Sequence, residues 1–121
     1  MSAVDWYWPG LLVAAVAQVA DGLCLYRAQG RLNTGSALAS TIEFGWLVVS
    51  VFVLLTGRLH GAASLAAVLY VSYNLAGIVQ GIALLRRHGD LESFAVPRWM
   101  VLLGIASGAA FALTALAQLG G

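Results

Sequence analysis

Two ionisable side chains, Asp21 and Glu43, lie within strongly apolar stretches of this chain of 121 residues. A charged group is costly inside a lipid bilayer, so an ionisable residue in a membrane span is a candidate for a functional site. A carboxyl group held in a dry pocket can exchange protons near neutral pH, or it can bind a substrate. Asp21 and Glu43 are therefore the first candidates for chemistry in the chain.

The elements that must position these carboxyl groups are helices that cross a membrane. The chain is 61% hydrophobic and only 9% charged, whereas a soluble domain carries about 25% charged residues. A hydrocarbon core about 30 Å thick needs roughly 20 apolar residues per helix. The sequence therefore predicts an all-α integral membrane bundle of four transmembrane helices, a single domain of residues 1–121 with spans at about 9–26, 37–56, 62–85 and 99–119.

Proline and aromatic residues predict where the spans meet the membrane surface. Pro9 fits the first turn of a helix, where its missing N–H needs no partner. Trp6, Tyr7 and Trp8 precede it as an aromatic belt at the membrane–water interface, and Trp99 is a second interfacial anchor. We therefore expect these aromatic side chains at the edges of the bilayer.

The distribution of arginine predicts the orientation of the chain. The second loop holds only Arg58, whereas the first and third loops hold Arg27, Arg31, Arg86, Arg87 and Arg98. The positive-inside rule then places the first and third loops in the cytoplasm and both termini outside. Arginine without lysine, in a chain rich in alanine, glycine, leucine and valine, is typical of a GC-rich bacterial genome, and we expect the cell inner membrane.

Polar residues are predicted at one depth in three of the spans. Asp21, Glu43 and Gln80 each lie six residues from the cytoplasmic end of a span, which is roughly 9 Å at 1.5 Å per residue. Gln18 shares a helix face with Asp21, because residues three apart are neighbours on a helix. The pattern indicates a polar cavity that opens to the cytoplasm.

Further polar and aromatic residues extend this layer toward the centre of the bilayer. The faces of tyrosine and tryptophan rings attract cations, which suits a cationic solute. Beyond Asp21, Glu43 and Gln80, the candidate substrate-binding residues are Gln18, Trp46, Tyr70, Tyr73 and Asn74.

Both carboxyl groups also have a structural interpretation. Asp21 reaches toward Arg27 or Arg31 in this alternative, and Glu43 bonds a neighbouring helix. Glu43 also belongs to a polar stripe along one helix face, whose members are spaced by four, three, four and three residues: Ser36, Ser40, Glu43, Leu47 and Ser50. The sequence leaves the functional and the structural interpretations open.

Two pairs of glycines permit close contact between helices. They are Gly77-x-x-x-Gly81 and Gly104-x-x-x-Gly108, and small residues at this spacing let helix backbones approach each other in membranes. Packing within the chain is one interpretation, and a homodimer seam through the fourth helix is the other. Four short helices enclose little space, so a transport site favours a homodimer.

The chain resembles the small multidrug resistance transporters, a drug/metabolite-type family with four spans in a similar length. Where their first helix carries an Ala-Glu-Val-like segment, this chain has Ala17-Gln18-Val19. Where their third helix carries a tyrosine, a tryptophan three residues on and then Gly-Ile-Val, it has Tyr70, Tyr73 and Gly77-Ile78-Val79. The resemblance implies a small transporter.

The chain departs from that family at the coupling glutamate. The family's glutamate falls on Gln18, which cannot carry a proton. If the resemblance holds, Asp21 or Glu43 must take that role, or the protein is not proton-coupled.

A second resemblance is to the three-helix unit of PQ-loop and SemiSWEET transporters. Tyr26-Arg27 followed by Asn33-Thr34-Gly35-Ser36 is similar to their first cytoplasmic loop, and Asn74 matches their third-helix asparagine. The Pro-Gln pair that names the family is absent from this chain, and a fourth helix is left over. The resemblance therefore covers only part of the chain.

Three functions are compatible with these features. The first is a permease-like transporter of a small polar or cationic solute that acts as a homodimer. The second is an accessory or assembly subunit of a larger membrane complex, and the third is a small intramembrane lipid-modifying enzyme with Asp21 and Glu43 as acid and base. We expect no nucleic-acid partner at a net charge of +1, and we expect no cofactor and no metal, because phosphate-loop, dinucleotide and metal-ligand motifs are absent.

Overall fold

Long helices make up nearly all of the computed structural model, which describes residues 2–89 and 94–120. Within that part of the chain they are α1 (Ala3–Arg27), α2 (Thr34–Leu55), α3 (Gly61–His88) and α4 (Arg98–Gly120). Each of the four is long and apolar enough to cross a membrane. The predicted all-α bundle of four such helices is therefore confirmed, and the fold supports a multi-pass membrane protein.

The first helix begins six residues earlier than the sequence predicts, at Ala3 rather than Pro9. Ser2 and Asp5 form a capping box, in which the Ser2 side chain accepts from the Asp5 N–H and the Asp5 carboxylate accepts from the Ser2 N–H. These bonds satisfy backbone donors at the start of the helix. The prediction that Pro9 lies in the first turn is therefore wrong, and Pro9 lies inside the helix.

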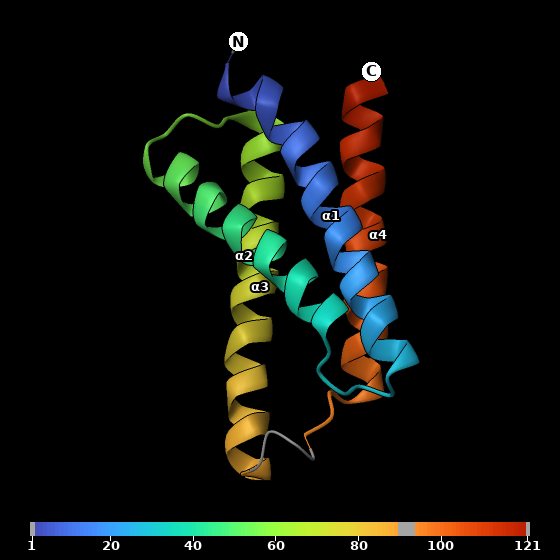
Figure 1. Ribbon diagram of the computed structural model, residues 1–121. Coiled ribbons are helices and arrows are strands. Elements are labelled where there is room, and N and C mark those ends of the chain that lie inside the picture. The colour runs from blue at the N-terminus through green and yellow to red at the C-terminus, as the bar shows by residue number, and fades with distance from the viewer. Residues whose placement is uncertain (1, 90–93, 121) are drawn as a thin grey trace.

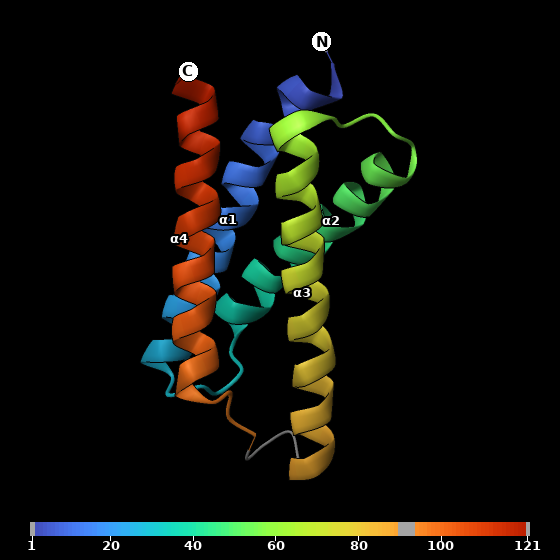
Figure 2. The same ribbon diagram turned by 180° about the vertical axis from the view of Figure 1, so that it is seen from behind.

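The helices alternate in direction, so that both termini lie at one end of the bundle together with the connection between α2 and α3 (Figure 1). The connections from α1 to α2 and from α3 to α4 lie at the other end, which we call the arginine end because Arg27, Arg31 and Arg98 are there. α1 is the central helix and packs most extensively on α4 and α2, while α3 packs mainly on α2. The same arrangement seen from behind shows α3 and α4 in front (Figure 2).

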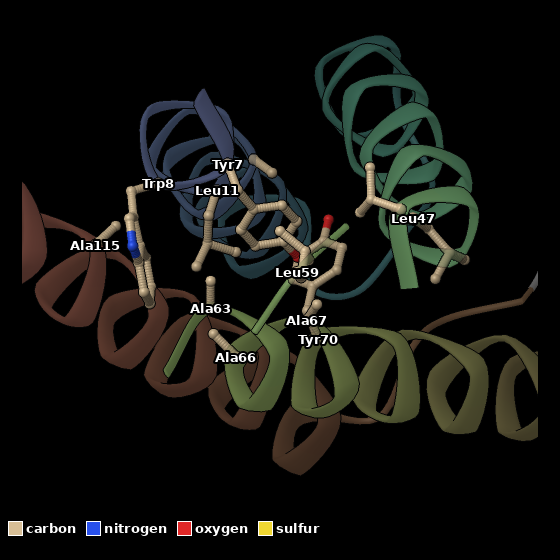
Figure 3. Close-up of a cluster of buried hydrophobic side chains, with 12 residues drawn as sticks. Tyr7, Trp8, Leu11, Leu47, Leu59, Ala63, Ala66, Ala67, Tyr70 and Ala115 are labelled. Carbon is tan, nitrogen blue, oxygen red and sulfur yellow. The ribbon is translucent and has the colours of Figure 1, made fainter. Parts of the chain in front are cut away.

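The apolar core fills the half of the bundle near the termini (Figure 3). Tyr7, Leu11 and Tyr70 have no exposed surface there, and the Tyr7 ring lies 5.0 Å from the Trp46 ring between centroids. Tyr7 and Trp8 are buried against other helices, whereas their predicted place at the membrane–water interface stays a prediction. Tyr7 is held in this position by α2, where its hydroxyl group forms a hydrogen bond with Ser50 Oγ at 2.8 Å.

One of the two glycine pairs brings helices into close contact within the chain. A Cβ at Gly108 would lie 2.9 Å from Val19 Cγ2 and 3.2 Å from the Ala15 carbonyl oxygen, so this glycine lets α4 lie directly against α1. At Gly77 and Gly81, by contrast, a Cβ would meet no described atom within 4 Å. No helix of the described chain therefore packs closely on Gly77 and Gly81, in the half of α3 nearest the arginine end.

Candidate functional site

A cavity of about 270 Å³, with two carboxyl groups in a largely apolar lining, lies in the half of the bundle nearest the arginine end. All four helices line it. Five of the eight candidate binding residues are among its lining residues, namely Gln18, Asp21, Glu43, Tyr73 and Asn74. We call this space the acceptor cavity, because the carboxyl groups of Asp21 and Glu43, which are hydrogen-bond acceptors, line it.

Asp21 is held by serine hydroxyls of α2. Ser36 Oγ donates to Asp21 Oδ1, and Ser40 Oγ donates to Asp21 Oδ2 at 3.3 Å. Asn33 caps α2 by accepting from the Ser36 N–H at 2.9 Å, which fixes the turn that carries Ser36. Asp21 is therefore oriented by α2, and no arginine lines the cavity among the described residues.

Glu43 lines the cavity from α2, and only 9% of its surface is exposed. Its backbone carbonyl accepts a hydrogen bond from Tyr70 Oη at 3.1 Å, which ties α3 to α2 beside the carboxyl group. The Glu43 and Asp21 carboxyl groups are close enough to interact electrostatically. Two carboxyl groups at such proximity in a low-dielectric space need a proton or a cation between them.

Gln18 adds a third acceptor to this space. Its Nε2 donates to the Gly104 carbonyl oxygen on α4 at 2.9 Å, so the amide nitrogen is committed to that bond. Its Oε1 is buried and has no hydrogen-bond partner among the described residues. A buried acceptor without a partner costs free energy, and the residue that carries it is one of those that line the cavity.

The polar side chains of α3 contribute no positive charge. Asn74 Nδ2 donates to the Tyr70 carbonyl oxygen of its own helix at 2.8 Å, and its amide is thereby oriented. Tyr73 reaches toward α4, where a Cβ added at Gly104 would lie 3.6 Å from Tyr73 Oη. Among the described residues, then, the cavity lining combines carboxyl and amide oxygens with one aromatic ring and holds no lysine, arginine or histidine.

The other three candidate residues lie outside the acceptor cavity. Trp46 packs edge-on against the Trp6 ring near the termini, with centroids 6.0 Å apart. Tyr70 is fully buried in the apolar core and reaches the site only through its bond to Glu43. Gln80 is exposed on the outer surface of α3, and it is not among the residues that this helix contributes to the cavity lining, namely Tyr73, Asn74, Gly77 and Ile78.

A second cavity, of about 430 Å³, joins the first toward the arginine end. Asp21 and Ser40 line both spaces, and the added walls are largely apolar, including Ile82, Leu85 and Phe94. The carboxyl groups are thus approached through an apolar vestibule between α1, α2 and α3.

Sequence reasoning missed the contribution of α4 to the site. Met100, Val101 and Gly104 line the acceptor cavity, but apolar side chains and a backbone carbonyl carry no signal in the sequence. The serine pair on α2 was visible as part of a polar stripe, and its spacing of four residues is the signal that both hydroxyls share one helix face.

No protein-family model, curated protein or solved structure matches this chain.

Replacing Ser36 by alanine should destabilise the folded bundle. Ser36 is 4% exposed, and its loss would remove a donor from the Asp21 carboxylate, which we expect to cost about 2 kcal/mol because hydrogen bonds to charged groups are strong. Thermal unfolding in detergent micelles measures this change. Ser72→Ala on the exposed side of α3 is the matched control, and equal melting temperatures for the two variants would contradict the Asp21 contact.

Proposed function

We propose that the chain is a small permease-like carrier that binds a cationic solute in the acceptor cavity. The proposal rests on one observation: the cavity is lined by two carboxyl groups but by no side chain that carries a positive charge, among the described residues. Asp21 and Glu43 contribute the two carboxyl groups, and the buried Oε1 of Gln18 has no hydrogen-bond partner among the described residues. A solute that carries an ammonium or similar group supplies the missing donors and the missing charge.

The physical reason is the cost of charge in a low-dielectric environment. Ionised carboxylates inside a membrane protein are stable only when they are paired or hydrogen-bonded. The hydroxyl groups of Ser36 and Ser40 donate hydrogen bonds to the Asp21 carboxylate, but they bring no positive charge. A bound cation or a proton must therefore neutralise the pair, and exchange of one for the other is the simplest way to couple a solute to protons.

The size and the walls of the site favour a small organic cation. The cavity of about 270 Å³ falls just below the range of about 300–1,000 Å³ that is usual for ligand pockets. Tyr73 offers an aromatic ring to such a cation, a contact that stabilises cations by about 0.5–2 kcal/mol. The apolar vestibule suits a solute that also carries hydrocarbon groups.

Neutralising the carboxyl pair should abolish cation binding. With n-butylammonium, which carries both a positive charge and N–H donors, as the probe, Glu43→Gln and Asp21→Asn should each weaken binding at least about tenfold, because loss of one member of a buried charge pair costs about 2 kcal/mol or more. Isothermal titration calorimetry of the protein in detergent measures the affinity. Flux into proteoliposomes should be lost in parallel.

Asp5→Asn is the matched control, because Asp5 is a carboxylate at the opposite end of α1. This variant should bind the probe as the wild-type protein does. Unchanged affinity in Glu43→Gln and Asp21→Asn would exclude the carboxyl pair from the site, and equal binding of a neutral or anionic analogue would contradict selection for a cation.

The exposed half of α3 favours a protein neighbour. Gln80 is exposed within this candidate span, where a polar amide is costly against lipid. Gly77 and Gly81 lie beside it with no described atom near the Cβ positions, so another helix has room to approach. A second copy satisfies both features, because two glutamine amides can donate to and accept from each other, and a homodimer would close the side of the cavity between α3 and α4.

Gln80→Leu should weaken self-association. A hydrogen bond between membrane helices contributes about 1 kcal/mol, so we expect the dimer to dissociate about fivefold more readily. Light scattering of the detergent-solubilised protein over a range of concentrations measures the molar mass. Gln118→Leu on the exposed surface of α4 is the control. A monomer that co-purifies with larger partners would contradict the homodimer and favour the second candidate function, an accessory subunit of a membrane complex.

A further inference from the structure

A third cavity, of about 440 Å³, lies at the arginine end between α1 and α4, next to the acceptor cavity, with which it shares Val96 and Val101. Its lining residues are Tyr26, Gln29, Gly30, Val96, Arg98 and Val101. Among the described residues it contains a guanidinium and no acidic side chain. We call it the headgroup pocket.

Backbone contacts between the first and third loops build the floor of this pocket. The Val96 N–H donates to the Gly30 carbonyl oxygen at 2.8 Å, and Arg31 forms an antiparallel bridge with Ala95. Gly30 has a φ of +85°, and a Cβ there would collide with the Val96 carbonyl oxygen, so only glycine fits. The pocket is therefore preformed by the fold rather than by a chance gap between side chains.

Arg98 is held in place at the mouth of the pocket by Tyr26. Its Nη2 donates to Tyr26 Oη at 3.0 Å, and its guanidinium carbon lies 5.4 Å from the centroid of the Tyr26 ring. This bond uses one of the five N–H donors of a guanidinium. An arginine fixed in this way by an aromatic ring is preorganised to bind an oxyanion through two parallel hydrogen bonds.

The surroundings of Arg98 place it at the level where lipid headgroups lie. Arg98 is the first residue of α4, and the next residue, Trp99, is 54% exposed, as expected for an interfacial tryptophan. Arg27 and Arg31 are exposed at the same end of the bundle. Arginines grouped beside a membrane span attract anionic lipids, each with about 1 kcal/mol near the surface.

We propose that the headgroup pocket binds the phosphate of an anionic phospholipid. Arg98 would hold two of the phosphate oxygens, and Gln29 also lines the pocket. Val96 and Val101 line the rest of the pocket, and such apolar walls suit the glycerol and upper acyl carbons of a lipid better than a hydrated inorganic ion. The proposal does not rest on the proposed function, because none of the polar side chains that line the acceptor cavity lines this pocket, and it requires only that the helices cross a membrane.

Native mass spectrometry of the full chain tests this proposal. The protein is released from micelles that contain phosphatidylglycerol and phosphatidylcholine with the same acyl chains in equal amounts. The wild-type protein should retain phosphatidylglycerol preferentially, and Arg98→Gln should lower that preference about fivefold, the factor that corresponds to one arginine near the surface. Tyr26→Phe keeps the charge but removes the bond that orients it, and it should lower the preference less.

Arg58→Gln is the matched control, because Arg58 lies at the opposite end of the bundle, in the connection between α2 and α3. It should leave the preference unchanged, and melting temperatures establish that each variant is folded. Equal losses in Arg98→Gln and Arg58→Gln would overturn the proposal by reducing it to a general charge effect. Displacement of the lipid by millimolar inorganic phosphate would overturn it by assigning the pocket to a free anion.

Discussion

Polar side chains inside an apolar bundle must find partners in other helices, and this requirement organises the structure around α1. In a membrane the apolar faces of helices gain little from leaving lipid, so packing and interhelical hydrogen bonds carry much of the association. Gln18 bonds α1 to α4 through the Gly104 carbonyl oxygen. Asp21 bonds α1 to α2 through Ser36 and Ser40, and Tyr7 does so again near the termini through Ser50 at 2.8 Å.

These bonds divide the bundle into a packed half and an open half. Near the termini, aromatic and small apolar side chains fill the interior (Figure 3). Toward the arginine end, α3 and α4 share few contacts, and the space between the helices is left to the acceptor cavity and its vestibule. The polar residues that join the helices also line this space, so one set of side chains both assembles the bundle and defines the candidate site.

The sequence predicted the four helices and the shared depth of Asp21 and Glu43, because hydropathy and helical rise are local properties of the chain. It also selected Gln18, Tyr73 and Asn74, which the structure brings to the same cavity. It did not predict that Gln80 faces outward, because depth in a span does not specify rotation about the helix axis. The burial of Tyr7 was missed for a related reason, since its position depends on a helix start that the capping box of Ser2 and Asp5 determines.

A cation supplied by the protein itself tests the central claim, that the cavity lacks a positive charge, most directly. Asn74 lines the cavity, and Asn74→Lys would place an ammonium group among the acceptors of Asp21, Glu43 and Gln18. The measurement is the melting temperature in detergent micelles, compared with the wild-type protein. The account predicts a higher melting temperature, because the lysine supplies the positive charge that the two carboxyl groups lack, whereas a lower one, as expected for a lysine placed in an ordinary apolar interior, would contradict it.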